Sequence, residues 1–342
     1  MNICIVAGGT LGHINPGLII AKELSKKHNV IYITSLKDKK FSVLEEANFL
    51  KKVFYIDSRG LSKKIFKNAY ALVKNINAYI KIKQIVKSEK IDLMIGMGGY
   101  ISGIAIICAQ HMKKRTMIHE QNKVIGLANK LVINKVEKSL FTFDIPEYKK
   151  TNTYIVGNPC MFVSIPSIYK ETKHILITSG SNGAKEINDL AVKIINKEYL
   201  KNYKITLITG KKYYEEVIKG VDKKTNVNII PFSNNMNEYI YRASIIISRA
   251  GSSTIAESIG LNTIPILIPS KNVTNNHQVK NALEIGRLGL GELVNDNENL
   301  VDDVLKLIKR IENNKNEYLR NIRNYKEKYS LKNIISIIEG EK

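Results

Sequence analysis

Short runs rich in isoleucine and valine alternate with helical patterns along the whole chain, and this alternation limits the fold more than any other feature. The runs are almost continuously apolar, which is typical of parallel strands that are buried on both faces of a sheet. In the first half, we expect strands at Asn2–Ala7, Val30–Thr34, Leu93–Gly96, Thr116–His119 and Ser139–Thr142. In the second half, we expect them at Ile175–Thr178, Ile205–Thr209, Asn228–Ile230, Ile245–Ser248 and Thr263–Ile268. The pattern predicts two doubly wound α/β domains, each with a parallel sheet.

A turn cluster at Gly157-Asn158-Pro159 ends the first series of strands and marks the expected domain boundary. The chain has 342 residues, which is enough for two domains with separate cores. We therefore expect domains at residues 1–158 and 159–325, followed by a helical tail at residues 326–342.

The composition, with 44% hydrophobic and 25% charged residues, is that of a folded globular protein. The three cysteines, Cys4, Cys108 and Cys160, are widely spaced and odd in number, so we expect neither a disulfide framework nor a metal knuckle. The first apolar run is too short for a signal peptide, and no run reaches the roughly 20 residues of a membrane-spanning helix. These features predict a soluble cytoplasmic protein.

Basic residues outnumber acidic ones by 53 to 31, and the excess is densest between Arg59 and Lys90. Within that segment, apolar residues recur near helical spacing at Ile65, Phe66, Ala69, Leu72, Val73, Ile76, Ile80 and Ile85. A basic amphipathic helix fits an anionic membrane or a phosphate-rich surface. The alternative is that lysines merely solvate a helix in a chain biased toward Lys, Asn and Ile. No nucleic-acid-binding module is evident, so we expect no nucleic-acid partner.

A glycine-rich loop follows the first expected strand and opens a helix with the sequence Gly8-Gly9-Thr10-Leu11-Gly12-His13. Glycines let the backbone approach a ligand closely, and a helix N-terminus favours anionic groups. Such turns also serve as plain tight connections, and this one is not a dinucleotide-binding fingerprint. An imidazole at His13 is a candidate general base toward a hydroxyl, or else it bonds a nearby backbone group.

The second half contains two further glycine loops that precede helices. They read Gly180-Ser181-Asn182-Gly183-Ala184 and Arg249-Ala250-Gly251-Ser252-Ser253-Thr254. Both offer N–H groups and hydroxyls to a diphosphate, although serine and threonine there also serve as helix N-caps. Glu257 lies about one turn into its helix, where its carboxylate either accepts ribose hydroxyls or complements the helix dipole.

Polar residues also gather at two other places. His119-Glu120-Gln121-Asn122 ends an expected strand with four polar side chains, which are costly to bury unless they bind or bond something. His277-Gln278 opens a later helix. No cluster has the spacing of metal ligands, so we expect neither a metal nor a cofactor. The charge of a diphosphate leaving group would then be met by helix dipoles, backbone amides and hydroxyls.

In order along the chain, these motifs resemble those of the MurG family of bacterial glycosyltransferases. The shared motifs are Gly8-Gly9-Thr10, Gly12-His13, Gly96-Met97-Gly98-Gly99-Tyr100, His119-Glu120-Gln121-Asn122, Gly157-Asn158-Pro159, Ser248-Arg249-Ala250-Gly251, Glu257 and His277-Gln278. The resemblance implies a GT-B fold, in which two Rossmann-like domains face each other across a cleft.

The resemblance also implies an activity. The family moves N-acetylglucosamine (GlcNAc) from UDP-GlcNAc to the C4 hydroxyl of the N-acetylmuramoyl (MurNAc) sugar of undecaprenyl-linked lipid I, with inversion. The product is lipid II, a precursor of peptidoglycan. The expected location is the cytoplasmic face of the cell membrane, where the protein would be peripheral, with an anionic membrane surface and cell-wall synthesis proteins as partners.

By position, the resemblance assigns residues to the donor UDP-GlcNAc. Asn122 is expected on the donor sugar, Gln278 on the GlcNAc hydroxyls and Ser181 at the diphosphate. The sugar–phosphate side would be lined by Thr10, Leu11 and Gly12. The nucleotide would be wrapped by Ser252, Ser253, Thr254, Ile255, Ala256 and Glu257, the last of these on the ribose.

For catalysis, the resemblance implies His13 as the base or orienter of the acceptor hydroxyl, with Glu120 as the competing carboxylate. The chain departs from the family's GGTGGH loop at Leu11, where a side chain narrows the approach to the diphosphate or requires a negative φ. Some members carry an arginine shortly after the GNP motif, whereas this chain has Cys160 and Met161.

Three other functions share part of this pattern. One is another GT-B glycolipid glycosyltransferase. The second is UDP-GlcNAc 2-epimerase, which shares the fold and the donor but needs no lipid acceptor. The third is a sugar-nucleotide-binding or membrane-surface module without catalysis.

Overall fold

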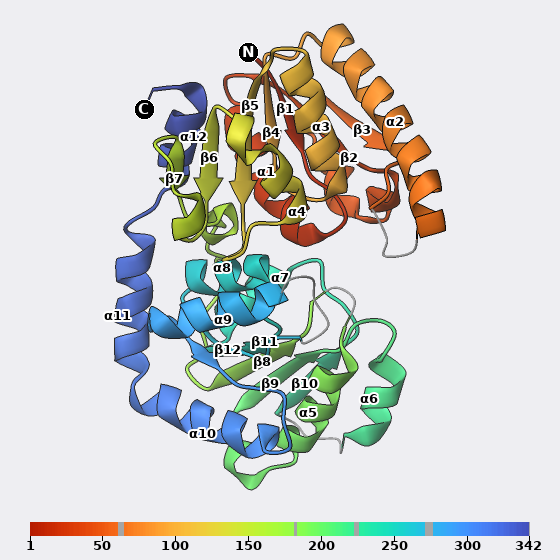
Figure 1. Cartoon of the computed structure of the whole chain (residues 1–342). Coiled ribbons are helices and arrows are strands. Elements are labelled where there is room, and N and C mark those ends of the chain that lie inside the picture. The colour runs from red at the N-terminus through yellow and green to blue at the C-terminus, as the bar shows by residue number, and fades with distance from the viewer. Residues whose placement is uncertain (61–64, 181–182, 222–225, 271–275, 342) are drawn as a thin grey trace. The chain divides into compact units, whose positions relative to one another are not determined.

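The computed structural model describes residues 1–60, 65–180, 183–221, 226–270 and 276–341, without the side chains of residues 65–69. The chain forms two compact units (Figure 1). The first unit contains Met1–Pro159 and Ser330–Lys342, and the second contains Cys160–Tyr329.

The sheet of the first unit has seven strands in the order β3-β2-β1-β4-β5-β6-β7, and all neighbours are parallel. The strands are β1 (Asn2–Val6), β2 (Asn29–Ser35), β3 (Lys52–Ile56), β4 (Leu93–Gly96), β5 (Arg115–Glu120), β6 (Lys138–Phe141) and β7 (Thr153–Ile155). The five strands expected here are confirmed, each to within one residue at either end. The edge strands β3 and β7 were not predicted, because most of their residues are only partly buried and their sequences are less continuously apolar.

The sheet of the second unit has six parallel strands in the order β10-β9-β8-β11-β12-β13. They are β8 (His174–Thr178), β9 (Lys204–Ile208), β10 (Val227–Ile230), β11 (Ile245–Ser248), β12 (Ile264–Leu267) and β13 (Glu292–Leu293). Five were expected and are confirmed, and β13 is a two-residue edge strand that no periodic pattern could indicate.

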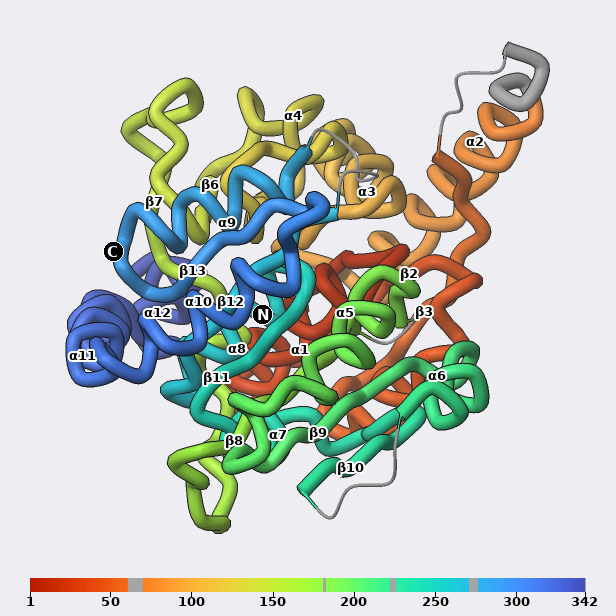
Figure 2. Tube along the Cα trace, turned by 90° about the horizontal axis from the view of Figure 1, so that it is seen from below, coloured from red at the N-terminus to blue at the C-terminus, as the bar shows by residue number. Residues whose placement is uncertain are grey.

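Helices cover both faces of each sheet, as expected for doubly wound units (Figure 1). In the first unit, α1 (Leu11–Leu24) packs with α12 (Leu331–Glu339), and α3 (Tyr100–His111) packs between α2 (Ile65–Ser88) and α4 (Leu127–Val132). In both views, α2 lies on the same side of the first unit as the edge strand β3 (Figure 2). The helices of the second unit are α5 (Lys185–Ile195), α6 (Tyr214–Gly220), α7 (Met236–Arg242), α8 (Ser252–Gly260), α9 (His277–Arg287), α10 (Leu300–Asn313) and α11 (Lys315–Lys326).

The C-terminal helix α12 returns to the first unit after α11 has ended in the second. Nε2 of His28 lies 2.8 Å from Oε1 of Glu339, and Nζ of Lys138 donates to the carbonyl oxygen of Ile337 at 2.9 Å. The last residues of the chain therefore complete the fold of the domain in which the chain began. No helix in the described ranges is long and apolar enough to cross a bilayer.

Each sheet reverses its strand order at one place, between β1 and β4 in the first unit and between β8 and β11 in the second. Loops after two such strands diverge and leave a crevice at the carboxyl edge, where ligands bind in doubly wound folds. The glycine loops of the sequence follow these four strands. The topology thus brings each pair of loops to one edge of its own sheet.

Candidate active site

The two glycine loops of the first unit meet backbone to backbone. Gly99 has a φ of 84°, and a Cβ atom there would lie 2.3 Å from the carbonyl oxygen of Gly8. Gly98 has a φ of 106°, and its Cβ would lie 2.7 Å from Nδ1 of His13. Both positions require glycine for space as well as for conformation. The close approach sets the start of α1 against the loop that follows β4.

A buried aspartate anchors the first glycine loop. Oδ2 of Asp38 accepts hydrogen bonds from the N–H of Gly9 at 2.9 Å, the hydroxyl of Thr34 at 2.8 Å and the N–H of Ser35 at 3.2 Å. Asp38 was not among the expected site residues, because it lies three residues beyond the strand end rather than on it. The signal that could have found it is the capping-box pair of Ser35 and Asp38, which the structure contains.

Three of the residues expected to bind the sugar donor UDP-GlcNAc lie at the beginning of α1. The carbonyl oxygen of Thr10, the N-cap, accepts from the N–H of His13 at 3.1 Å, and the Thr10 side chain makes no capping bond. Leu11 begins the helix and is not among the residues with positive φ, so its side chain fits the helical backbone. Gly12 follows it within the first turn. The helix N-terminus is therefore retained despite the missing glycine.

A chain of polar contacts leads from His13 into the protein. Nδ1 of His13 lies 2.9 Å from Oε1 of Gln121, and Nε2 of Gln121 lies 3.1 Å from Nδ1 of His119. Nε2 of His119 lies 3.2 Å from the carbonyl oxygen of Gly157. Gln121 and His119 are fully buried, and desolvation lowers the pKa of His119 to about 4. The His119 ring is therefore neutral at pH 7.

The buried carboxylate of Glu120 organises the loop after β5. Oε1 accepts from the backbone N–H of Asn122 at 3.1 Å and from its side-chain amide at 3.2 Å. Oε2 accepts from the N–H of Gly126 and from Nδ2 of Asn129, both at 2.9 Å. These four bonds engage both oxygens, and a proton taken from a substrate would have to displace one of them. This geometry favours His13 over Glu120 as the base, and it holds Asn122 in place.

In the second unit, the loop after β11 leads into α8, with Gly251 as the N-cap. Ser252, Ser253 and Thr254 are partly exposed in the first turn, whereas Ile255 and Ala256 are buried in the core. The N–H of Ile255 already donates to the carbonyl oxygen of Gly251 at 3.0 Å. Within this turn, residues 252–254 are therefore the ones that can offer hydrogen-bonding groups to a ligand, whereas Ile255 and Ala256 are not.

Glu257 lies in α8 and is partly buried. Desolvation raises its pKa to about 7, and among the described residues none donates a hydrogen bond to its carboxylate. Cys160 lies near it, and burial raises the pKa of the Cys160 thiol well above its usual value. The backbone of Met161 packs against Gly260, where a Cβ would lie 2.3 Å from the Met161 carbonyl oxygen. Cys160 and Met161, which stand where some family members carry an arginine, thus belong to a segment that packs against α8.

Helix α9 is tied to the same loop. Nδ2 of Asn281 donates to the carbonyl oxygen of Ala250 at 3.3 Å, and Oε1 of Gln278 accepts from the N–H of Ser270 at 2.9 Å. Gln278 is therefore bonded to the loop after β12, and Asn281 of the same helix is bonded to the loop before α8. The expected diphosphate residue Ser181 lies outside the described residues.

Arg249, at the end of β11, connects that loop to its surroundings. Its guanidinium donates to Oε2 of Glu186 at 2.9 Å and to the carbonyl oxygen of Ile268 at 3.3 Å. These bonds link the loop to α5 and to the end of β12, so Arg249 holds the two sides of the crevice together. Within the described part of the chain, no three His, Cys, Asp or Glu side chains are grouped as metal ligands.

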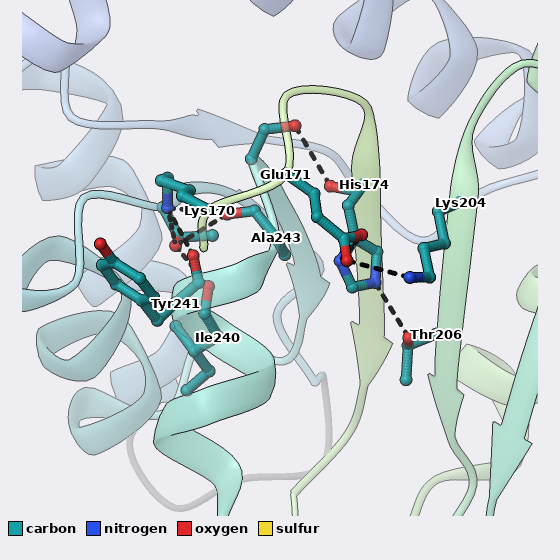
Figure 3. Close-up of polar contacts among 10 residues, drawn as sticks. Lys170, Glu171, His174, Lys204, Thr206, Ile240, Tyr241 and Ala243 are labelled. Atoms are coloured by element: carbon teal, nitrogen blue, oxygen red, sulfur yellow. Dashed lines mark hydrogen bonds and ion pairs between the residues drawn. The ribbon is translucent and has the colours of Figure 1, made fainter. Parts of the chain in front are cut away.

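A second polar cluster in this unit lies at the amino edge of the sheet, at the opposite end of β8 from its glycine loop (Figure 3). Nζ of Lys170 lies 2.9 Å from the carbonyl oxygens of Tyr241 and Ala243, 3.3 Å from that of Leu261 and 3.1 Å from Oγ1 of Thr263. Burial, together with Lys315 and Lys326, lowers the pKa of Lys170 to about 7. The cluster closes the ends of α7 and α8 and is structural.

Comparison with known proteins agrees with this architecture. Residues 3–140 match the glycosyltransferase family 28 N-terminal domain, and residues 174–335 match the glycosyltransferase family 28 C-terminal domain. The UDP-N-acetylglucosamine–N-acetylmuramyl-(pentapeptide) pyrophosphoryl-undecaprenol N-acetylglucosamine transferase of Leuconostoc mesenteroides is 32% identical over 320 residues, which are 86% of each chain. The protein of the same name from Bacillus cytotoxicus is 31% identical over 330 residues, which are 91% of this chain and 90% of the relative.

Solved structures share the fold. MurG from Acinetobacter baumannii is similar with a TM-score of 0.77 and 22% identity, covering 99% of both chains. A putative UDP-N-acetylglucosamine 2-epimerase from Listeria monocytogenes is similar with a TM-score of 0.75 and 12% identity, covering 99% of this chain and 96% of that chain. The two parallel-sheet units of this chain have the GT-B fold.

Proposed function

This chain belongs to glycosyltransferase family 28 and, within it, to the MurG family, and from that premise we propose the reaction that it catalyses. It is a UDP-sugar glycosyltransferase of peptidoglycan synthesis. The proposed reaction transfers GlcNAc from UDP-GlcNAc to the C4 hydroxyl of MurNAc in lipid I and forms lipid II. The observation that carries the proposal is the identity of 31–32% to transferases of that name over nearly nine-tenths of the chain.

The donor is assigned to the second unit. Ser252, Ser253 and Thr254 open α8, where helix N–H groups and hydroxyls suit a diphosphate. Glu257 lies further along the same helix, and no described residue donates a hydrogen bond to its carboxylate, which suits it to accept the hydroxyls of a ribose. Gln278, in the first turn of α9, is assigned to the GlcNAc hydroxyls.

The acceptor is assigned to the first unit, where His13 takes the proton. As the C4 oxygen of MurNAc forms a bond to C1 of GlcNAc, the O–H bond breaks and its proton passes to the imidazole. The bond from C1 to the diphosphate oxygen breaks in the same step, and UDP leaves with the electron pair. One displacement of this kind inverts the configuration at C1. Thr10, Gly12 and Asn122 are assigned to positioning the sugars.

The apolar side of α2 supports a membrane-docking role. Leu72, Val73 and Ile76 are each more than half exposed, although other residues of α2 pack into the core. Lys81 and Lys83 are exposed in the next turns. Lysines alone would explain a solvated helix, but exposed large apolar side chains among lysines fit the headgroup region of an anionic bilayer. We assign this surface, Leu72, Val73, Ile76 and Ile80, to the cytoplasmic leaflet that holds lipid I. The side chains of Ile65 and Phe66, expected on the same helix, lie outside the described residues.

The decisive experiment is turnover with UDP-GlcNAc and a soluble lipid I analogue. The wild-type chain should form the disaccharide product with inversion, and His13→Ala should lower kcat by about two to four orders of magnitude. His111→Ala, an exposed histidine on α3, is the matched control and should retain activity. Conversion of UDP-GlcNAc to UDP-ManNAc without an acceptor would replace this proposal by the epimerase function.

A further inference from the structure

We propose that Gln121 and His119 fix the ring tautomer of His13, so that Nδ1 carries the hydrogen and Nε2 is the atom that accepts the proton from the acceptor hydroxyl. The second half of this statement rests on the proposed role of His13 as base. The first half is a property of the first unit alone, because all the residues concerned lie within it.

The order of donors and acceptors begins at Gly157. A carbonyl oxygen only accepts, so Nε2 of His119, 3.2 Å away, carries a hydrogen. Burial keeps this ring neutral, since the pKa of His119 is lowered to about 4. A neutral imidazole has one N–H, and Nδ1 of His119 is therefore an acceptor.

The next link is the side-chain amide of Gln121. Its nitrogen lies 3.1 Å from Nδ1 of His119 and 3.1 Å from the carbonyl oxygen of the same residue. Both partners accept hydrogen bonds, so both require the amide nitrogen, with its two hydrogens, on this side. The orientation of the amide is thereby determined, and Oε1 faces His13.

The last link determines the state of His13. Oε1 of Gln121 only accepts, so Nδ1 of His13, 2.9 Å away, carries the hydrogen. Gly98 packs against the same edge of the ring, since a Cβ there would lie 2.7 Å from Nδ1 and 2.8 Å from Cε1. The ring is thus held at one edge by a hydrogen bond and by backbone, and the lone pair of the neutral ring is on Nε2.

This arrangement suits a base that must both take up and release a proton. If Nε2 carried the hydrogen instead, His13 would have no lone pair for the acceptor hydroxyl. The side-chain amide of Gln121 selects the tautomer and is neutral. A carboxylate in its place would add a negative charge, and that charge would stabilise the protonated ring. After transfer, Nδ1–H keeps its bond to Gln121 and the new proton resides on Nε2. Gln121 is therefore a positioning residue.

The test uses the full chain labelled with ¹⁵N-histidine. The chain has six histidines, and His13 is assigned by the signals lost in His13→Asn. A ring nitrogen that carries hydrogen is distinguished from one that does not by its ¹⁵N shift and its couplings to ring protons. We expect hydrogen on Nδ1 of His13 and on Nε2 of His119 under conditions where His13 is neutral. Hydrogen on Nε2 of neutral His13 would overturn the proposal.

Two variants of Gln121 separate tautomer control from packing. Gln121→Met removes both hydrogen-bonding groups at similar size, and neutral His13 should then populate both tautomers. Gln121→Glu keeps an acceptor toward His13, so the Nδ1–H form should persist while the His119 signals change. The matched control is Gln110→Met on α3, whose amide makes one long bond of 3.5 Å. It should leave the His13 signals unchanged.

Kinetics link the tautomer to turnover. Gln121→Met should lower kcat by about ten- to a hundredfold, because the His13 ring loses the bond that orients it as well as its single tautomer. The KM for UDP-GlcNAc should change little, and Gln121→Glu should recover part of the loss. An unaltered His13 tautomer in folded Gln121→Met would refute the proposal. If the tautomers behave as expected but His13→Ala retains full turnover, the role of His13 as base fails and the tautomer assignment stands.

Discussion

Gly98 and His13 are in such close contact that a single Cβ atom on Gly98 would lie 2.7 Å from Nδ1 of His13. The strands β1 and β4 are adjacent in the sheet, although β1 ends at Val6 and β4 begins only at Leu93. The loops that follow these two strands are in direct contact. The backbone after β4 is the wall against which the His13 ring rests.

We expect Gly98→Ala to lower kcat by about a hundredfold, because a displacement of the order of 1 Å at a catalytic group can cost this much. An alanine that replaces a glycine at positive φ adds strain of about 1 kcal/mol. Gly340→Ala is the control for strain, since Gly340 has a φ of 85° and a Cβ there meets nothing closer than 3.9 Å. Gly340→Ala should lower thermal stability but leave kcat unchanged. Equal kcat in Gly98→Ala and Gly340→Ala would contradict the role of the contact between Gly98 and His13 in turnover.

Glu257 should make the stability of the protein depend on pH. Its pKa is raised to about 7 from a usual value of 4.5, so the folded protein holds the proton more tightly than the unfolded chain. The resulting stabilisation is complete below pH 4.5 and is lost as pH rises through about 7, amounting to roughly 3 kcal/mol at most.

Urea unfolding of wild type and Glu257→Gln at pH 5 and pH 8 measures this effect. The amide does not ionise, so the variant should gain stability relative to wild type as pH rises. Glu298→Gln, an exposed residue in the same unit, should show no such gain. The donor KM of Glu257→Gln should rise at both pH values if the side chain binds the ribose.

Lys170 should be a stability residue without a role in turnover. Lys170→Met leaves the carbonyl oxygens of Tyr241 and Ala243 without the ammonium group and should cost about 2–4 kcal/mol of unfolding free energy. Lys197→Met removes an exposed lysine of the same unit and should cost almost nothing. A loss of kcat in folded Lys170→Met would contradict the structural assignment.

The exposed apolar side of α2 should govern binding to membranes. Replacing Leu72, Val73 and Ile76 together by glutamine should weaken binding to vesicles that contain anionic lipid, without loss of thermal stability, since these side chains are exposed. Flotation or sedimentation with vesicles measures the binding. Leu283→Gln, 55% exposed in the second unit, is the matched control. Unchanged binding of the triple variant would exclude α2 as the docking surface.

Lys81 and Lys83 contribute the electrostatic part of the same surface. Their replacement by glutamine should weaken vesicle binding by about 1 kcal/mol for each lysine at low salt, and the difference should shrink as salt is added. Neutral vesicles should not distinguish this variant from wild type.

Ten strands were predictable to within one residue. All of them except β10 are largely buried, and a strand buried on both faces leaves an apolar pattern that does not depend on its neighbours. The glycine loops could also be located, since positive φ and close backbone approach are demands on a single residue type. The edge strands β3, β7 and β13 were not predicted, because partial burial and a length of two to five residues leave little period in the sequence, although β10, a fourth short edge strand, was expected.

Sequence alone thus determined the two doubly wound units, the places where loops open helices, and the residue types available there. Only the tertiary structure decided which of those residues meet. It engages both carboxylate oxygens of Glu120 in four hydrogen bonds, brings Asp38 back to the loop at Gly9, and returns α12 to the first unit. It also joins His13 to Gln121 across 108 positions of sequence. Hydrogen bonds of this range depend on how strands are ordered in the sheet, and strand order is set by packing of the whole domain rather than by any local pattern.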